Sequence, residues 1–586
     1  MTIPVESEHI TTWVERLSAA AEQGKPIDLA EGCAAYSTGR SRAGGRAWGP
    51  ERQIPAAALR TVLINRNLAV DPHGIHIRAA WISGPVDLEN VEFEHALHLR
   101  GCRIEHLIDL SGSTLKELNL NGSHIQSLAL DGATITGTVF AGEGFTATGE
   151  IHALEARIGG QLALRGARLA NPGGVALRLD RAMINGDVFA DDGFTATGEI
   201  RATSANIGGQ LSLNGATLAN RGGVALCLDQ ATINGDVFAD DGFTATGEIR
   251  AIGANIGGGL SLTNATLTNP GGAALNLDQA MINGSVIADK GLTAIGEVRA
   301  GGARIDGQLI LNGATLKNPD GVALDLESSV ITTLTLTPAQ VDGTTDLTRA
   351  TIIDLHTPPN TQPPGQLIAT GWQITDVHGL IRTDRRAATQ WLKSTAPGHG
   401  FTAQPWHALA TVYDRNGQPV DARRLRFIAA KQTTKYAPRS TKPLSWMYLA
   451  IAGHGYYPLR AAAWLAGALL VGIFITELNT EHFIPVDRAA AIKSAAAHAT
   501  ETHTPPPRLI TAAEPCSSYP DYPCFSAFNY NLAGVVPAAT GVSKSDWTIA
   551  STAPVLLTST FTALRFFAWI FTAILLAGVT GLLRKT

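Results

Sequence analysis

Acidic side chains recur in the middle of the chain at a spacing that could serve catalysis. Asp187, Asp191 and Asp192 return 49 residues later as Asp236, Asp240 and Asp241. Clustered carboxylates can cleave glycans by acid–base chemistry, and parallel β-helices host such enzymes. An active site needs one special place, however, whereas these acids belong to a repeated turn. The recurrence therefore favours a solvated, repeated face over a catalytic site.

The cysteines could carry redox chemistry. Cys516 and Cys524 flank the segment YPDYP and could form a disulfide in an oxidising compartment, or stay two free thiols in a reducing one. Seven residues separate them, which differs from the CxxC spacing of disulfide oxidoreductases. Cys33, Cys102 and Cys227 are dispersed, and we expect them to be small core residues.

One glycine-rich segment, Gly398–Ala403, matches the pattern GxGxxA. A dinucleotide-binding turn lies between a strand and a helix, but residues 388–393 before this segment read as a helix, so we interpret it as an interhelical loop. The sequence contains no CxxCH, GxSxG or HExxH and no clustered cysteines. It therefore predicts no catalytic residue, no metal ligand and no cofactor.

The elements that position these residues come from an internal repeat. Phe145, Phe194, Phe243 and Leu292 each begin the same phrase, 49 residues apart. Short apolar pairs alternate with Gly, Asn and Asp, which is typical of strands and turns and has no helical period. We predict a mainly β fold, a right-handed parallel β-helix like a pentapeptide-repeat solenoid, over 65–356, with the clearest repeats at 145–340.

The repeat also predicts the length of the solenoid and what covers its first coil. Each 49-residue unit should form two coils plus a loop, with Asn-Pro-Gly-Gly segments at 171–174 and 269–272 projecting from one edge, and the rod should be about 60 Å long. Residues 1–64 should form a helical cap, in which the amphipathic segment 8–24 covers the first coil. An interaction arm is the alternative for that segment.

Composition limits the function. The 586 residues include 45 basic and 50 acidic side chains, a net charge of −5, so the chain has no basic field for non-specific nucleic-acid binding. Residues 141–330 hold twenty acids and twelve bases. A long, regular acidic surface favours a protein partner on the solenoid, recognised by the Asn-Pro-Gly-Gly loops or by the unrepeated coils at 65–140.

Beyond the repeats, proline pairs predict a linker at 357–382, followed by a cytoplasmic helical region at 383–445. Within that region, 405–435 resembles a tetratricopeptide-like helical hairpin. One hairpin cannot bury its own core. It must therefore pack on the rod, on the membrane or on a partner.

Two apolar stretches, 459–476 and 555–583, approach the length of about 20 residues that spans a bilayer. Nine basic residues and one acid occupy 415–460, whereas 477–553 holds four basic residues and seven acids. By the positive-inside rule we predict a multi-pass plasma-membrane protein with both termini cytoplasmic and 477–553 outside. The expected membrane anchors are Arg460, Trp464, Arg565, Trp569, Arg584 and Lys585.

The second apolar stretch allows two arrangements. A short span over 566–583 would leave 554–564 at the interface with Arg565 reaching outward, and one long tilted helix is the competitor. The apolar segment 525–539 is too short to cross, so it is either re-entrant or on the outer face. Two spans and a re-entrant segment would also suit a small channel-like oligomer.

Four segments in order resemble a family: QPWHALATVYDRNGQPVDARRLRFIAAKQ, GHGYYPLRAAAWLAG, FSAFNYNLAGVVP and the closing GVTGLLRK. With the preceding β-helix they resemble actinobacterial membrane proteins that are often labelled membrane-associated oxidoreductases or pentapeptide-repeat proteins. The resemblance covers nearly the whole chain and implies architecture and location, with no catalytic residue to carry across.

We therefore predict a membrane-anchored cytoplasmic β-solenoid that acts as a binding or scaffold protein. The expected partners are the lipid bilayer and a protein on the solenoid surface, with oligomer formation left open. A membrane-associated oxidoreductase, as the resemblance implies, and a channel-like membrane oligomer are the alternatives.

Overall fold

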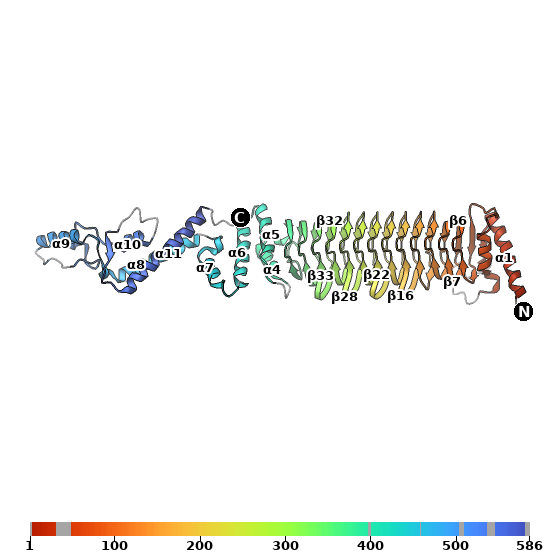
Figure 1. The fold of residues 1–586 in the computed structure, drawn as a ribbon, viewed down its shortest axis with the longest axis horizontal. Coiled ribbons are helices and arrows are strands. Elements are labelled where there is room, and N and C mark those ends of the chain that lie inside the picture. The colour runs from red at the N-terminus through yellow and green to blue at the C-terminus, as the bar shows by residue number, and fades with distance from the viewer. Residues whose placement is uncertain are drawn as a thin grey trace. The chain divides into compact units, whose positions relative to one another are not determined.

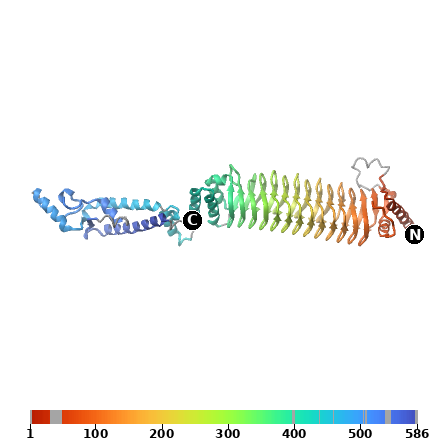
Figure 2. The same ribbon diagram turned by 90° about the horizontal axis from the view of Figure 1, so that it is seen from above.

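The computed structural model describes residues 3–30, 48–395, 400–436, 438–457, 459–502, 505, 509–535 and 545–580. The chain divides into two compact units, Met1–Gln418 and Pro419–Thr586. Each unit has its own architecture (Figures 1 and 2).

The first unit is built around a parallel β-solenoid in which two sheets face each other (Figure 1). Sheet A contains β1 (Ile27–Asp28), β3 (Ile75–Arg78), β6 (Glu92–Arg100), β8 (Thr114–Asn119), β10 (Thr134–Ile135), β11 (Val139–Phe140), β14 (Arg157–Ile158), β15 (Leu162–Ala163), β17 (Met183–Ile184), β18 (Val188–Phe189), β20 (Asn206–Ile207), β21 (Leu211–Ser212), β23 (Thr232–Ile233), β24 (Val237–Phe238), β26 (Asn255–Ile256), β27 (Leu260–Ser261), β29 (Met281–Ile282), β30 (Val286–Ile287), β32 (Arg304–Ile310), β34 (Val330–Thr335), β36 (Thr351–His356) and β38 (Gln373–His378).

Sheet B contains β2 (Gln53–Pro55), β4 (Trp81–Ser83), β5 (Val86–Asp87), β7 (Arg103–Asp109), β9 (His124–Ala129), β12 (Thr146–Ala147), β13 (Ile151–His152), β16 (Arg168–Arg178), β19 (Thr195–Arg201), β22 (Thr217–Cys227), β25 (Thr244–Arg250), β28 (Thr266–Asn276), β31 (Thr293–Arg299), β33 (Thr315–Asp325), β35 (Gln340–Asp346) and β37 (Gln366–Ile368).

The strand register explains the 49-residue repeat. Ile184 pairs with Ile207, 23 positions later, and Ile207 pairs with Ile233, 26 positions later. Two turns therefore make one repeat, which confirms the predicted parallel solenoid. About 13 turns run from 75 to 378. At about 4.8 Å per turn the solenoid is about 60 Å long. Its right-handed sense stays a prediction.

The interior is filled by stacked apolar side chains. Phe145, Phe194 and Phe243, which begin the repeated phrase, are fully buried on alternate turns, and Leu292 continues their row. The turns between them have an alanine at the same register position, because Arg168 pairs with Thr195 and Thr195 with Thr217, each one residue after the row. Ala167 and Ala216 are buried as well, so a large side chain alternates with a small one along this row.

A loop interrupts sheet B on every second turn. In β22 the register shifts between Ala219 and Val224, and the Asn220 side chain donates a hydrogen bond across the loop base to the Val224 carbonyl at 2.8 Å. The neighbouring strand β25 supplies Gly247 with φ of +116°. A Cβ atom at this glycine would lie 2.5 Å from the Asn220 carbonyl oxygen, so the loop requires glycine there.

The N-terminal end is covered by helices α1 (Ile3–Gln23) and α2 (Ala56–Leu63), with the short 3-10 helix η2 (Pro50–Arg52) between them. These helices pack on each other and on the first strands. Trp13 and Leu17 of α1 and Leu59 of α2 are buried. In addition, β1 and β2 of this region pair with β3 and β4, so the region expected to be wholly helical also contributes strands.

The structure corrects the prediction of a linker at 357–382, because this segment continues the solenoid. Strand β37 pairs with β35, and β38 pairs with β36 over its whole length. The proline pairs precede these strands and occupy the connection between β36 and β37. Proline at a connection removes no ladder hydrogen bond, so here it does not end the solenoid.

Three helices follow the last turn: α3 (Leu380–Thr383), α4 (Arg385–Lys393) and α5 (Gln404–Arg415). Helix α5 packs on β38 and α4 packs on β37. The Tyr413 hydroxyl donates to the carbonyl of Ile381, and Trp406 is buried. The helices thus cover the exposed edge of the last turn. The predicted hairpin would join α5 to a helix of the second unit, and it stays a prediction.

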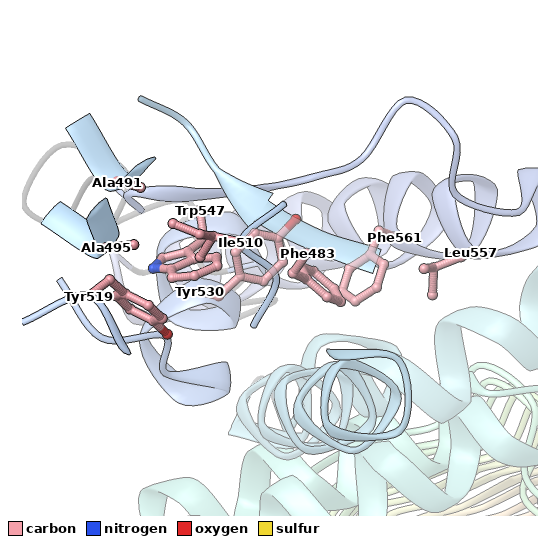
Figure 3. Packing of buried hydrophobic residues seen from close by; sticks show 9 residues of the cluster. All are labelled: Phe483, Ala491, Ala495, Ile510, Tyr519, Tyr530, Trp547, Leu557 and Phe561. Atoms are coloured by element: carbon pink, nitrogen blue, oxygen red, sulfur yellow. The ribbon is translucent and has the colours of Figure 1, made fainter. Parts of the chain in front are cut away.

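The second unit is mainly helical. Its elements are α6 (Pro419–Tyr436), α7 (Lys442–Ala452), η3 (Gly453–Gly455), α8 (Leu459–Leu478), η4 (Thr480–His482), β39 (Phe483–Pro485), α9 (Arg488–Thr502), η5 (Cys516–Ser518), α10 (Ala527–Val535), β40 (Trp547–Ile549) and α11 (Val555–Val579). Helices α8 and α11 pack together, and α10 packs on both. An aromatic cluster around Phe483, Tyr530 and Phe561 joins them (Figure 3). Residues 555–579 form one continuous helix, as in the single-helix arrangement.

The close approach at the loop base can be tested by Gly247→Ala. The new Cβ atom would meet the Asn220 carbonyl, and alanine would also have to adopt a strained positive φ. We therefore expect the free energy of local unfolding at the loop base to fall by at least about 2 kcal/mol. Gly242→Ala is the control, since Gly242 also has positive φ but nothing lies within 4 Å of its Cβ position. Hydrogen–deuterium exchange of β22 and β25 in the full-length chain would measure the local stability of both variants. Equal exchange in the two variants would contradict the packing argument.

Candidate binding surface of the solenoid

A row of polar and charged side chains runs along sheet B, because residues at one register position stack in successive turns. Arg178 pairs with Arg201, Arg201 with Cys227, and Cys227 with Arg250. We call this row the arginine ladder; it contains His152, Arg178, Arg201, Cys227, Arg250, Asn276, Arg299, Asp325 and Asp346. The four arginines of this row all lie on sheet B, so they mark one side of the solenoid.

Aspartates fix the ladder arginines in place. The nitrogen–oxygen distances are 2.7 Å for Arg201 with Asp180, 2.8 Å for Arg250 with Asp229 and 2.9 Å for Arg299 with Asp278. The same aspartates accept backbone N–H groups of the next turn, from Thr203, Ile252 and Gly301. Each of these three guanidinium groups is therefore held by a carboxylate that is itself held by the backbone, which pre-organises them. The fourth ladder arginine, Arg178, pairs with Glu150 at 2.9 Å.

Half-buried carboxyl groups accompany the ladder. Burial raises the pKa of Glu199 and of Glu297, although neighbouring arginines oppose the shift. Burial also raises the pKa of Asp325 at the C-terminal part of the row. Part of the desolvation that a partner would impose on these groups has therefore already occurred in the folded chain, which lowers the cost of binding there.

Four loops stand beside the ladder on the same strands. Their tips are exposed, and in each loop an asparagine side chain donates to the carbonyl four residues later at 2.8 Å. The loops are 171–174, 220–223, 269–272 and 318–321 in β16, β22, β28 and β33, which follow one edge in Figure 1. Arg221 and Asp320 are the charged tip residues. We call these four segments the loop row.

The repeated aspartates hold the solenoid together. Asp187 accepts the Gln210 N–H at 2.9 Å, and Asp236 accepts the Gly259 N–H at 2.7 Å. Asp191 accepts the Ser212 hydroxyl at 2.8 Å and is buried, so it is not part of the solvated face that the sequence predicted. The burial follows from its place at a corner, where its carboxylate bridges two turns. Repetition of these acids thus has a structural cause.

A second polar cluster, which sequence analysis missed, lies on the last turns. Asp354 of β36 pairs with Asp376 of β38, and His356 pairs with His378. The His378 Nε2 atom lies 3.9 Å from Asp354 Oδ1 and 3.7 Å from Asp376 Oδ2. The two words Asp-Leu-His and Asp-Val-His, 22 residues apart, were the available signal. They stand outside the 49-residue repeat, where the register was not predicted.

The GxGxxA segment has the surroundings of a loop between helices. Helix α4 precedes it and α5 follows it, whereas a dinucleotide turn connects a strand to a helix. Residues 396–399 of this segment lie outside the described part of the chain. A pocket beside it is lined mainly by apolar groups, among them Leu367, Phe401 and Trp406.

The predicted membrane anchors lie in different surroundings in the second unit. The Arg460 guanidinium lies over the rings of Phe427 and Tyr457, at 5.3 and 5.2 Å from their centres. Trp464 donates its indole N–H to the Ala450 carbonyl. Trp569 is 62% exposed. Arg584 and Lys585 lie outside the described residues.

Arg565 of α11 points towards helix α10. A Cβ atom on Gly534 would lie 3.1 Å from Arg565 Nη2, so glycine allows the guanidinium to approach the C-terminal turn of α10. That end of a helix carries partial negative charge. The charge of Arg565 is therefore opposed within the protein by the helix dipole. Residues 536–539 of the segment predicted to be re-entrant lie outside the described range.

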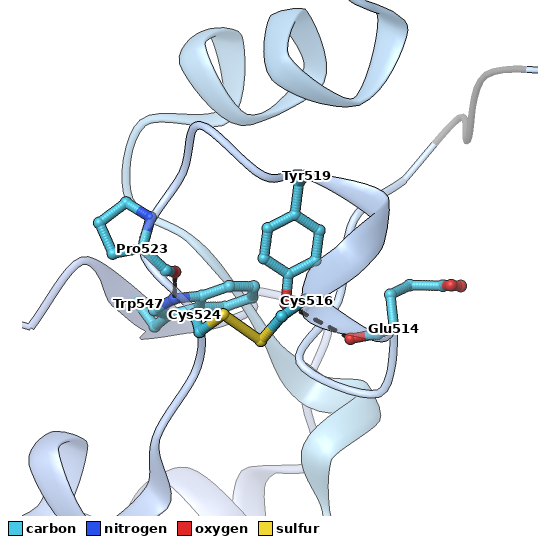
Figure 4. Close-up of a disulfide and its surroundings, with 6 residues drawn as sticks. All are labelled: Glu514, Cys516, Tyr519, Pro523, Cys524 and Trp547. Atoms are coloured by element: carbon cyan, nitrogen blue, oxygen red, sulfur yellow. Dashed lines mark hydrogen bonds between the residues drawn. A yellow bond between two sulfur atoms is a disulfide. The ribbon is translucent and has the colours of Figure 1, made fainter. Parts of the chain in front are cut away.

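Cys516 and Cys524 are joined by a disulfide, with Cα atoms 5.4 Å apart, beside Tyr519 and Trp547 (Figure 4). The Trp547 indole donates to the Pro523 carbonyl at 2.9 Å. Cys102 and Cys227 are buried free thiols. Cys102 agrees with the expected small core residue, whereas Cys227 lies in the arginine ladder, where its sulfur is 3.5 Å from Arg250 Nη2. Cys33 lies outside the described residues. The disulfide closes a short loop on the aromatic cluster of this unit.

Comparisons with known proteins bear on the fold. No protein-family profile matches the chain, and no curated protein matches it. Among solved structures the chain is similar to HetL, a pentapeptide repeat protein involved in heterocyst differentiation regulation from the cyanobacterium Nostoc sp. strain PCC 7120. The identity is 17%, the match covers 42% of this chain and 87% of that chain, and the TM-score is 0.21. The parallel β-solenoid therefore rests on this chain's own strand register, and the resemblance to actinobacterial membrane proteins stays a prediction.

Proposed function

We propose that the chain is a membrane-anchored protein whose solenoid binds a protein partner in the cytoplasm. Helices α8 and α11 support the membrane part, because they are long and apolar enough to cross a bilayer and only 17% of each apolar window is buried. Large apolar side chains on them face outward, including Leu470, Phe474 and Phe566. Lipid is the solvent that suits such a surface.

The flanking charges support the orientation. Nine basic residues and one acid lie between 415 and 460, before α8 and in its first turn. Basic residues are retained on the cytoplasmic side, so the solenoid and both termini would be cytoplasmic. The segment between α8 and α11, which holds the disulfide, would lie on the oxidising side, where disulfides persist.

The loop row is the observation that carries the binding function. Four loops of the same length recur on every second turn of one side, about 10 Å apart, and each is fixed by its own asparagine. Rigid loops lose little conformational entropy when they are bound. Residues 141–330 together carry twenty acids and twelve bases, so this part of the solenoid as a whole is acidic, which favours an elongated partner with a basic face.

Site-specific photo-crosslinking in cells that express the full-length chain would test this binding side. We expect a photoreactive residue at Arg221 or Pro270 of the loop row to form a discrete protein adduct that weakens at high salt, since the attraction is electrostatic. The control position is Met281, which is exposed on sheet A. Adducts of equal yield from Met281, or none from either loop position, would contradict the proposal.

Thiol counting would test the membrane orientation. The chain has five cysteines, and a disulfide in the outer segment leaves three for alkylation in denaturant. We therefore expect mass spectrometry of the unreduced chain from cells to find three alkylated thiols, rising to five after reduction. The double variant with Cys516→Ser and Cys524→Ser is the control. It should give three alkylated thiols with or without reduction. Five alkylated thiols in the unreduced wild-type chain would place this segment in a reducing compartment.

A further inference from the structure

We propose that Asp354, Asp376 and His378 bind a divalent transition metal of the zinc class on the last turns of the solenoid. One ligand atom from each of these residues can be chosen so that all lie within 4.8 Å of one another. The site is independent of the partner-binding function, since it lies on sheet A whereas the loop row lies on sheet B.

The backbone register brings the three groups together. Asp354 and Asp376 are direct neighbours on β36 and β38, strands about 4.8 Å apart. Within β38, Asp376 and His378 lie two residues apart and therefore project from the same face. The residues between the polar ones, Leu355 and Val377, are buried. Burial of these alternate residues fixes the direction in which the polar side chains project.

A second layer of contacts orients the ligands. The amide of Asn416, the C-cap residue of α5, donates to Asp376 Oδ1 at 2.8 Å, and the Val377 N–H donates to the same oxygen at 2.8 Å. This leaves Asp376 Oδ2 facing the His378 Nε2 atom at 3.7 Å. The His356 ring stacks on His378 with centres 4.4 Å apart. Contacts of this kind fix ligand orientation at metal sites.

The donor set selects the metal class. Two carboxylate oxygens and one imidazole nitrogen suit zinc and similar ions, whereas calcium and magnesium prefer oxygen ligands alone. A tetrahedral ion with bonds of about 2.0 Å needs donors about 3.3 Å apart. Side-chain rotations would have to shorten the 3.7 and 3.9 Å distances to His378 Nε2 and to bring the two carboxylate oxygens, which lie within 4.8 Å of each other, into that range. Three protein ligands leave a coordination position for water or another small ligand.

Arg382 opposes cation binding at this place. Its Nη1 atom lies 3.6 Å from Asp376 Oδ2 and 3.5 Å from His378 Nδ1, so its charge neutralises the carboxylate that the metal would use. The Arg382 side chain is 37% exposed and can turn to solvent. Metal and guanidinium therefore compete for one carboxylate, which predicts opposite effects for ligand and arginine substitutions.

Zinc titration of the full-length, tag-free chain in detergent would test the site. We expect one zinc ion per chain, with affinity reduced at least about tenfold by His378→Ala or Asp376→Asn and increased by Arg382→Ala. His98→Ala is the matched control, because His98 also stacks on a histidine, His76 at 4.2 Å, but faces a single carboxylate, Glu117 at 2.7 Å. Its zinc affinity should equal that of the wild-type chain.

Cobalt absorption gives a readout that does not depend on stability. Bound Co²⁺ should show the intense visible bands of a low-coordinate site in the wild-type chain and lose them in Asp376→Asn, a substitution that keeps side-chain size. Circular dichroism would verify that the variant retains the β-solenoid. The proposal is wrong if the wild-type chain binds no zinc at micromolar concentration. It is equally wrong if zinc and cobalt binding are the same in folded Asp376→Asn as in the wild-type chain.

Discussion

Parallel hydrogen bonding between successive turns is the constraint on which the solenoid depends. Each turn must present its backbone N–H and C=O groups to the next turn in one register, because a buried unpaired group is costly. Ile184, Ile207 and Ile233 therefore stack, and every other position of the repeat stacks with them. A repeated sequence thereby places its equivalent positions in rows along the solenoid. The apolar core, the arginine ladder and the loop row are three such rows.

The loop row shows how a longer turn is accommodated without loss of this register. The extra residues leave the sheet between Ala219 and Val224, and Asn220 closes the gap that they create. The facing Gly247 removes the side chain that would otherwise separate the two strands. Asparagine and glycine on neighbouring turns therefore act as a pair, which explains why both recur in every repeat. The loop can vary at its tip, as Arg221 and Asp320 do, while its base stays constant.

The solenoid could be predicted from sequence because near-identical words at a fixed period reveal stacking directly. Its end could not, because the turns after 340 no longer follow the 49-residue period, and the proline pairs before β37 resemble a linker although they occupy a connection. The polar cluster of Asp354, Asp376 and His378 was missed for the same reason: its residues meet only through the register of β36 and β38. Cys516 and Cys524 could be identified as candidates, but their pairing required the fold of the intervening loop.

The solenoid has two kinds of surface, one along its regular repeats and one at its last turns. Within the regular repeats a side chain such as Asp187 has equivalents on other turns and is occupied by contacts that hold those turns together. A regular surface therefore suits extended recognition, where many equal contacts add up. At the last turns Asp354 and Asp376 stack on each other, but β34 has Thr333 at the same register position. Asn416, the C-cap residue of α5, lies outside the repeat and contributes to the cluster. A single localised site can form there because the constraint of repetition has ended while the strand register still fixes the side chains.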